Sequence, residues 1–103
     1  MFLTLTSSFQ FEWNEEKAST NFKKHSIEFD MAARVFLDTL RLDFSDNRED
    51  YGEERRNTIG NIDGIIVHVT YTPREGRIRL ISARKANSKE RERYDGQDGQ
   101  VHT

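Results

Sequence analysis

The sequence predicts a single α+β domain, in which a short strand and two helices precede an antiparallel β-sheet and a third helix follows it. Apolar residues recur at helical spacing over residues 15–37 and alternate with polar residues from 40 to 85. The dipeptide Asp63-Gly64 separates two of the alternating segments and is typical of a tight β-hairpin. Consecutive strands joined by short turns favour an antiparallel arrangement over a parallel one.

The composition fits one small, polar domain. The chain has 103 residues, of which 34% are apolar and 33% are charged, and its formal net charge is −2. Seven phenylalanines permit a compact core, but a large self-sufficient core is not expected, so stability is expected to depend partly on a partner. The absence of cysteine excludes a disulfide scaffold, a zinc–thiolate site and a cysteine nucleophile. No apolar run reaches the ~20 residues of a membrane span, and residues 1–8 lack the basic region of a signal peptide, so we expect a cytoplasmic protein.

The first half of the chain is expected to form a strand and two helices. Residues 9–13 alternate apolar and polar side chains, as a short strand does. Asn14 is expected to cap a helix over residues 15–24, because asparagine is a favoured N-cap and two glutamates follow it. The apolar stripe of this helix is thin and consists of Ala18 and Phe22. Residues 27–37 are expected to form the second helix. Its apolar face consists of Phe29, Ala32, Ala33 and Phe36.

The second half is expected to form a meander of strands and a last helix. The strands are expected over residues 40–44, 53–61, 65–72 and 77–85, with turns at 63–64 and 73–76. Asn87 is expected to begin the last helix, with Glu90 at the capping-box position. We divide the chain into an N-terminal extension over residues 1–9, a domain over 10–95 and a frayed tail over 96–103.

Arginines in the predicted strands are the strongest candidates for chemistry. An arginine within an apolar strand must find an anion or reach solvent, and the planar guanidinium suits bidentate phosphate binding. Alternation places Arg77 and Arg79 on one face of the last strand with Ile81 and Ala83, and Arg84 on the other face. For Arg79, a structural ion pair with Glu54 is the alternative that remains open.

Other candidates lie at element ends. Segment 74–93 carries eight basic and three acidic side chains, which suits phosphate or an acidic partner, although a solvated face is the more common explanation of such a block. For Arg84 and Lys85, a solvated strand end is the alternative. His25 suits proton transfer near neutral pH, or a contact with the helix C-terminus. Tyr94 is expected either to anchor the last helix or to face RNA. The histidines show no metal-ligand spacing, and no glycine-rich phosphate loop occurs, so no cofactor or metal is expected.

Four segments, in order and at matching separations, resemble the BrnT toxin family. They are Phe11-Glu-Trp-Asn-Glu-Glu-Lys17 with Asn21 and Lys24-His25, Phe29-Asp-Met-Ala-Ala-Arg-Val-Phe36 with Asp38, Glu54-Arg55 with Ile59-Gly60, and Arg79-Leu-Ile-Ser-Ala-Arg-Lys-Ala86 with Glu90-Arg91 and Tyr94. The likeness covers about residues 10–95. Asn14 stands where the family usually has aspartate, which also caps helices. Ser26 stands where the family often has glycine, so a left-handed C-cap there would be strained.

The resemblance implies a RelE-like fold and a toxin of a type II toxin–antitoxin system. It implies a metal-independent ribonuclease that needs no cofactor and arrests growth by cutting RNA. The implied partners are a BrnA-like ribbon-helix-helix antitoxin that neutralises it, RNA as substrate, and operator DNA only through the antitoxin complex, with no membrane. We expect the ribose 2′-hydroxyl to attack the adjacent phosphate, which requires a base, an acid and cations.

The residues proposed for this reaction fall into two sets. The catalytic set is His25, Glu54, Arg55, Arg79 and Arg84. The RNA-binding set is Lys17, Lys24, Lys85 and Tyr94. Arg79 and Arg55 are expected to stabilise the phosphate, with Arg84 in support, and either His25 or Glu54 is the candidate acid or base. The alternatives are a binding module without catalysis and a degenerate toxin that folds and binds its partner but is inactive.

Overall fold

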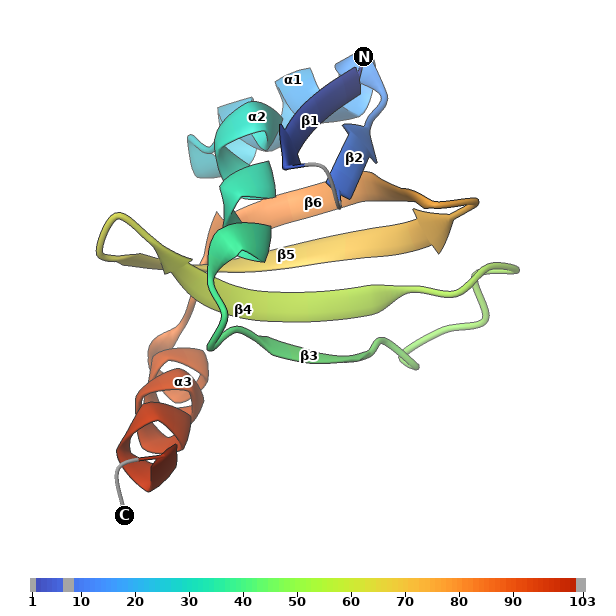
Figure 1. The fold of residues 1–103 in the computed structure, drawn as a ribbon. Helices are drawn as coiled ribbons and strands as arrows, with labels where there is room; N and C mark the ends of the chain where they lie inside the picture. The colour runs from blue at the N-terminus through green and yellow to red at the C-terminus, as the bar shows by residue number, and fades with distance from the viewer. Residues whose placement is uncertain (1, 7–8, 102–103) are drawn as a thin grey trace.

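The computed structural model describes residues 2–6 and 9–101, and within them it forms a six-stranded mixed sheet with helices on both faces (Figure 1). The elements are β1 (Phe2–Thr6), β2 (Phe9–Glu12), α1 (Glu15–His25), α2 (Phe29–Ala32), the 3₁₀ helix η1 (Ala33–Leu37), β3 (Leu42–Ser45), β4 (Arg56–Ile62), β5 (Ile65–Arg74), β6 (Arg77–Lys85) and α3 (Ser88–Val101). The strand order across the sheet is β1-β2-β6-β5-β4-β3. This confirms the α+β class.

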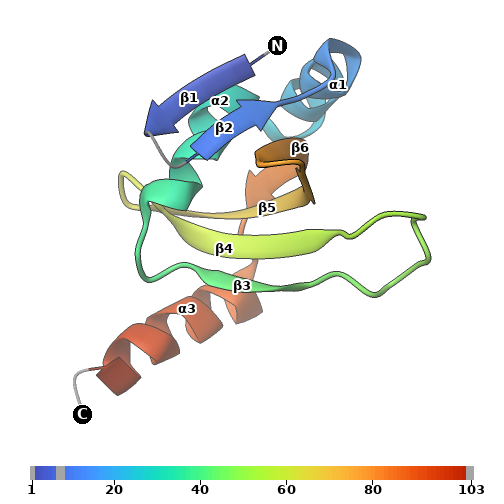
Figure 2. The same cartoon turned by 45° about the vertical axis from the view of Figure 1, so that its right-hand side comes forward.

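The N-terminal strands add a feature that the sequence did not predict. The meander β3–β6 is antiparallel, as expected, but β2 lies parallel to β6. Residues 2–6, predicted as part of an extension, form β1, which pairs antiparallel with β2 and extends the sheet (Figure 2). Met1 and residues 7–8 lie outside the described residues. The sheet is therefore mixed, and the chain crosses it from β2 to β3 through α1, α2 and η1.

Helix α1 is fastened to the edge of β6 by a buried asparagine. The Asn14 side chain accepts a hydrogen bond from the backbone N–H of Lys17 at 3.1 Å, which confirms the N-cap. Phe22, one of the two residues of the apolar stripe, is 46% exposed and does not belong to the core. Asn21 is buried instead: its Nδ2 donates to the carbonyls of Ile27 and Ala83, and its Oδ1 accepts from the Ala83 N–H at 2.9 Å. A polar side chain can lie here because all these bonds are made.

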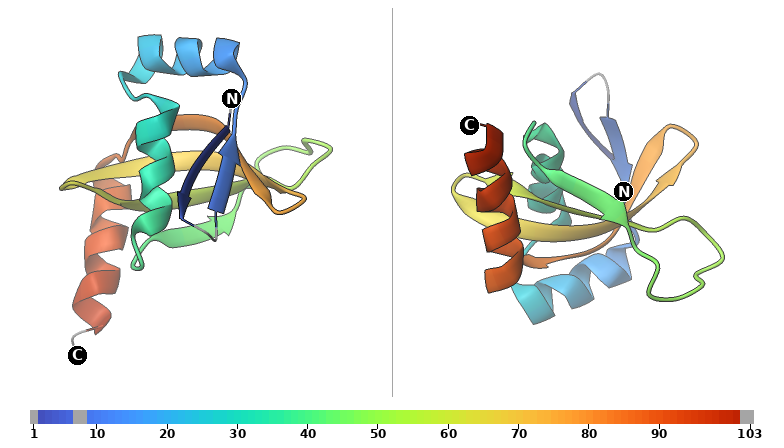
Figure 3. Two further views of the ribbon diagram at one scale, coloured as in Figure 1. Left: turned by 45° about the horizontal axis from the view of Figure 1, so that its top comes forward. Right: turned by 90° about the horizontal axis from the view of Figure 1, so that it is seen from below.

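The second helix is divided in two. The segment predicted as one helix over residues 27–37 is one turn of α-helix followed by a tighter 3₁₀ turn. Its four expected apolar residues are buried, as predicted. On β4, Gly60 permits a close approach of η1, because a Cβ there would lie 2.7 Å from Val35 Cγ2. Helices α2 and η1 thus pack tightly across one face of the sheet (Figure 3).

The two faces of the sheet differ in what covers them. The helix face carries the main core. Its buried strand residues include Phe11, Val67, Val69, Tyr71, Leu80 and Ala83. We call the opposite side the open face, because α3 covers only one end of it. There Ile59, Ala86 and Tyr94 form a small second core. Beyond this second core, the open face carries polar side chains. They include Glu12, Asn57, Thr70, Thr72 and Arg79.

A β-bulge in β6 decides which arginines share the open face. Along this strand the register shifts between the pairs Thr70↔Ser82 and Tyr71↔Leu80, so Ile81 is the extra residue. Strict alternation placed Arg79 and Arg84 on opposite faces, which is wrong, because the bulge restores both to the open face.

The ends of α1 and α3 agree with their sequence signals, except that α3 extends further than expected. Asn87 and Glu90 form the reciprocal capping box at the start of α3, with both bonds at 2.9 Å. Ser26 adopts the left-handed conformation (φ 59°), so the strained C-cap is kept without glycine. The tail expected to fray from residue 96 is helical to Val101, and residues 102–103 lie outside the described part. No helix among the described residues is long and apolar enough to cross a membrane.

Candidate functional site

Arg79 stands on the open face beside a carboxylate that it shares with a second arginine. It lies opposite Glu12 of β2 on one side and Thr72 of β5 on the other. Its Nη1 is 3.8 Å from Glu12 Oε2, and Arg77 Nη1 is equally far from the same oxygen. At this distance neither contact is a close hydrogen bond. Glu12 therefore offsets the charge of two cations without fully engaging the guanidinium of Arg79.

Arg55 is the second loosely paired arginine of this face. Its guanidinium stacks on the Tyr51 ring at 4.0 Å from the centroid, and its Nε lies 3.6 Å from Glu53 Oε2. That Nε is buried and has no hydrogen-bond partner in the part of the chain that the structure describes. Glu53 also accepts a hydrogen bond from Thr72 Oγ1 at 3.3 Å. Arg55 directly precedes β4, whose first residue Arg56 pairs with Tyr71, and Arg79 of β6 pairs with Thr72. Arg55 and Arg79 thus lie on the two sides of Thr72, about 10 Å apart across β5.

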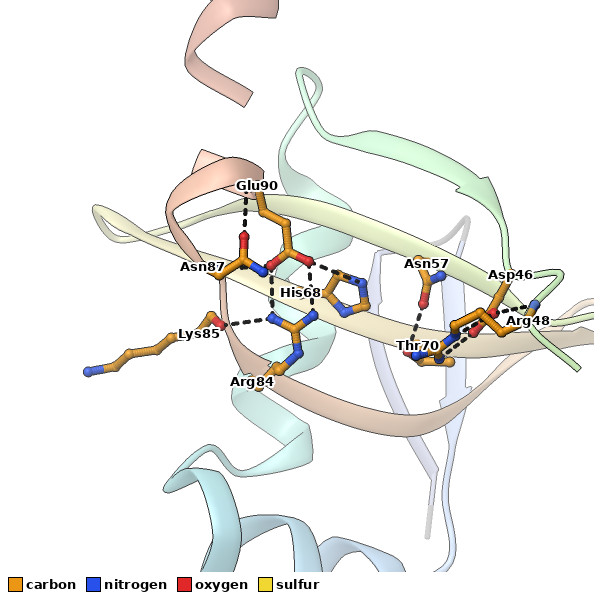
Figure 4. Close-up of polar contacts among 9 residues, drawn as sticks. All are labelled: Asp46, Arg48, Asn57, His68, Thr70, Arg84, Lys85, Asn87 and Glu90. Carbon is orange, nitrogen blue, oxygen red and sulfur yellow. Dashed lines mark hydrogen bonds and ion pairs between the residues drawn. The ribbon is translucent and has the colours of Figure 1, made fainter. Parts of the chain in front are cut away.

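A third arginine on this side comes from the loop between β3 and β4. The backbone N–H of Asp46 donates to the Arg55 carbonyl at 2.8 Å, which continues the pairing of the two strands by one step. The Asp46 carboxylate is fully buried and binds Arg48 (Figure 4). The hydrogen bond from Arg48 lowers the pKa of Asp46 to about 2. Arg48 belongs to a loop that its composition marks only as polar and acidic, so sequence analysis missed it.

At the α3 end of the open face, Arg84 is held closely by Glu90. Its Nη1 and Nη2 donate to the two oxygens of Glu90 at 2.8 and 2.9 Å (Figure 4). This bonding lowers the pKa of Glu90 to about 2. His68 Nε2 lies 3.9 Å from Glu90, and burial, together with the charge of Arg84, lowers the pKa of His68. Arg84 therefore joins β6 to the start of α3.

A groove of about 400 Å³ runs between α1 and the edge of β6. Lys17, Lys24 and His25 line its α1 side and are all exposed, and Ser82 lines the β6 side. His25 ends α1, whereas Arg79 pairs with Glu12 just before α1 begins. The 11 residues of α1 span about 16 Å, so His25 lies well away from Arg79. The structure brings these three of the four basic residues of α1 together around the groove, which Glu16 also lines, but not beside the arginines.

The comparison with protein families identifies the chain. The family described as "Ribonuclease toxin, BrnT, of type II toxin-antitoxin system" matches residues 13–90. The chain belongs to the BrnT family. Membership makes it a ribonuclease toxin of a type II toxin–antitoxin system and implies an antitoxin partner. No curated protein matches the chain significantly.

Two acidic expectations for this BrnT chain change with the structure. Glu54 Oε2 lies 3.4 Å from Arg56 Nη1, and Arg56 belongs to the helix face, where it also binds Asp43. The alternative pairing of Arg79 with Glu54 is therefore wrong, because Arg79 faces Glu12. The acids beside the arginines of the open face are Glu12 and Glu53, which sequence analysis did not select.

Two residues expected to bind RNA, Tyr94 and Lys85, lie away from the arginines of the open face. Tyr94 is 7% exposed and donates to Asp38 Oδ2 at 2.5 Å, so it anchors α3 and has no surface left for RNA. Lys85 is exposed but pairs with Val67, whose side chain lies on the helix face, so it points away from Arg84 (Figure 4). Within the described residues, no three His, Asp or Glu side chains gather as metal ligands would.

Proposed function

We propose that this toxin is a metal-independent endoribonuclease whose scissile phosphate binds between Arg79 and Arg55 on the open face. The observation that supports this is that both arginines are only loosely paired with acids. Each lies more than 3.5 Å from its carboxylate, and both flank Thr72. Guanidinium groups that are not committed to close ion pairs can donate to a phosphate, and they stabilise the charge that develops on it.

The reaction needs one proton acceptor close to these arginines. The ribose 2′-oxygen attacks the neighbouring phosphorus, the P–O5′ bond breaks, and a 2′,3′-cyclic phosphate and a 5′-hydroxyl form. Glu53 is placed to take the 2′-hydroxyl proton and to return it to the leaving 5′-oxygen, because it contacts both Thr72 and Arg55. Glu12 holds Arg77 and Arg79 in position.

The basic groove along α1 would guide the RNA strand. Lys17, Lys24 and His25 line it and are exposed, so they suit the phosphates of neighbouring nucleotides. His25 acts there as a binding group, since about 16 Å of helix separates it from the position of Arg79. Arg84 supports the site indirectly by fixing α3 against β6.

The partner side of the proposal rests on family membership. A ribbon-helix-helix antitoxin neutralises the toxin in this proposal, and operator DNA is contacted only through the complex of the two. We propose a cytoplasmic location, because RNA cleavage that arrests growth would act there. The RelE-like topology stays a prediction, which superposition on such a ribonuclease would test.

The test is an RNA cleavage assay with purified protein in EDTA. We expect fragments that end in 2′,3′-cyclic phosphate, visible by mass spectrometry. Binding without fragments would instead support a non-catalytic module or a degenerate toxin. Two adjacent residues give a matched pair for the base: Glu53→Gln should lower the cleavage rate about 100-fold or more, and Glu54→Gln should not. The reverse result would return the role to Glu54.

A further inference from the structure

The loop between β3 and β4 holds Arg48 in an ion pair with the buried Asp46 carboxylate, and most of the Arg48 side chain stays exposed. We propose that Arg48 is a second phosphate-binding residue, which takes another phosphodiester of the RNA strand bound at Arg79 and Arg55. The inference rests on the proposed function. It concerns binding and not the chemical step, so it can be tested separately.

The contacts of Arg48 hold one edge of its guanidinium in place. Its Nε donates to Asp46 Oδ1 at 2.9 Å and its Nη2 donates to Asp46 Oδ2 at 2.7 Å. The backbone N–H of Arg48 adds a bond to Asp46 Oδ1 at 3.3 Å. A guanidinium has five N–H donors, and this fork uses one from Nε and one from Nη2. The remaining donors lie on the outer edges of the group, where the Tyr51 side chain also interacts with the guanidinium.

Exposure separates the two members of this pair. The Asp46 side chain is 0% exposed, whereas the Arg48 side chain is 73% exposed. A buried carboxylate needs a partner for its charge. Because most of the Arg48 side chain is exposed, an anion can reach its outer edge while the inner edge stays bound to Asp46. The two hydrogen bonds to Asp46 hold the Arg48 guanidinium in one orientation. This lowers the side-chain entropy that Arg48 would lose on binding an anion.

The position of Asp46 connects Arg48 to the proposed site. Glu12, Arg79 and Thr72 pair across the sheet, and extending the β4–β5 register by one residue from Arg56↔Tyr71 brings Arg55 beside Thr72. The Asp46 N–H donates to the Arg55 carbonyl, so Asp46 continues this row. Adjacent strands lie about 4.8 Å apart, so Asp46 is about 14 Å from Arg79 across the open face. Figure 4 shows the Asp46–Arg48 pair beside Asn57 and Thr70, whose side chains join at 2.7 Å. A strand crossing the face from Arg79 would meet Arg48 after Arg55.

The ligand chemistry follows from the groups presented. An exposed, fixed guanidinium edge matches the two non-bridging oxygens of a phosphodiester. The neighbouring Tyr51 ring already stacks on Arg55, so the loop also holds an aromatic group near the strand path.

The experiment measures binding of a 2′-O-methyl RNA oligonucleotide, which lacks the attacking hydroxyl and cannot be cut. Removing Arg48 alone would leave Asp46 buried and charged, so the main variant is Asp46→Asn with Arg48→Gln, which keeps hydrogen-bonding groups without charge. Its affinity should fall about tenfold, and the slope of log affinity against log salt should become shallower by about 0.7, the value for one phosphate contact with a single strand. Arg34→Gln is the matched control, because Arg34 also pairs with an aspartate, Asp63, outside the open face. Neither quantity should change in that control.

A second variant covers the case in which the double variant does not fold. Arg48→Lys keeps a positive charge beside Asp46 but loses the planar guanidinium that binds two oxygens at once. The affinity for the oligonucleotide should therefore fall, while the slope of log affinity against log salt should not change. Wild-type affinity in both variants, or a wild-type protein that does not bind the oligonucleotide, would overturn the inference. Failure of the proposed function reads differently: intact 2′-hydroxyl RNA would stay uncut, while the Arg48 variants would still weaken binding.

Discussion

The two ends of the open face each hold an arginine of β6 next to a carboxylate, and they differ in how the pair is built. Arg84 binds both oxygens of Glu90 at 2.8 and 2.9 Å, whereas Arg79 lies 3.8 Å from Glu12. Exposure does not separate them, because the Arg84 side chain is 36% exposed and that of Arg79 is 28% exposed. The geometry of the acid therefore distinguishes an arginine that holds the fold from one that remains able to bind a ligand.

The acids differ because their elements differ. Glu90 is fixed by the capping box of α3, where it also accepts the Asn87 N–H, so it meets Arg84 in a set orientation. Glu12 lies on β2 and faces two arginines at once. Because Glu12 is shared between two arginines, its carboxylate makes a close hydrogen bond with neither of them.

The largest expected effect is the loss of RNA cleavage when Arg79, the loosely paired arginine, is removed. Arg79→Ala should lower RNA cleavage by about 100- to 1,000-fold, because one stabilising donor of the transition state is lost. Its free energy of unfolding should change by less than about 1 kcal/mol, because the ion pair that it loses is long and partly exposed. Cleavage rates and urea midpoints measure the two effects, with Arg34→Ala as control. Full activity in Arg79→Ala would remove Arg79 from the proposed site.

The second-largest effect is expected at Arg84, where a substitution should reduce stability more than cleavage. Arg84→Ala leaves Glu90, whose side chain is 16% exposed, without its cation. We expect the free energy of unfolding to fall by about 2 kcal/mol, measured as a lower urea midpoint. Cleavage per folded molecule should fall far less than in Arg79→Ala. A variant as stable as wild type that has lost cleavage would reverse the two assignments.

The third effect is on the pH dependence of stability. The pKa of Glu90 is lowered from 4.5 to about 2 in the folded protein. A lowered folded-state pKa gives stability that is present above about pH 4.5 and is lost as the pH falls toward 2. Glu90→Gln should therefore be less stable at pH 7 by roughly 1 kcal/mol, and its urea midpoint should fall less between pH 4.5 and 3. Asp46, whose pKa is also about 2, leaves some acid sensitivity in the variant. Parallel pH profiles for the two proteins would contradict this role of Glu90.

Sequence patterns predicted most elements because local signals carry them. The caps at Asn14 and Asn87 and the Asp63-Gly64 turn are local features, and each is found where expected. The parallel pairing of β2 with β6 was not predictable, because it joins residues far apart in the chain. The same holds for Asn21, which binds Ala83, 62 residues away.

The candidate site was predicted in part. Arginine chemistry selected Arg55, Arg79 and Arg84, and the structure places all three on one face. Their faces could not be read from alternation, because the bulge at Ile81 changes the parity within β6. The acids were missed for a related reason. Glu53 and Glu54 are adjacent and chemically alike, and only the fold turns Glu53 toward Thr72 and Glu54 toward Arg56.

The smallest expected effect is at Ser26, the C-cap of α1. It lies at the end of the helix that lines the basic groove. Ser26 holds a left-handed conformation that glycine adopts without strain, so Ser26→Gly should raise the free energy of unfolding by about 0.5–1 kcal/mol. The C-cap bond from the Ser26 N–H to the Phe22 carbonyl, at 2.8 Å, needs no side chain and should persist. His25 and Lys24 should keep their places, so cleavage should not change. A gain in stability accompanied by a loss of cleavage would mean that the Ser26 side chain, and not its backbone, takes part in binding along the groove.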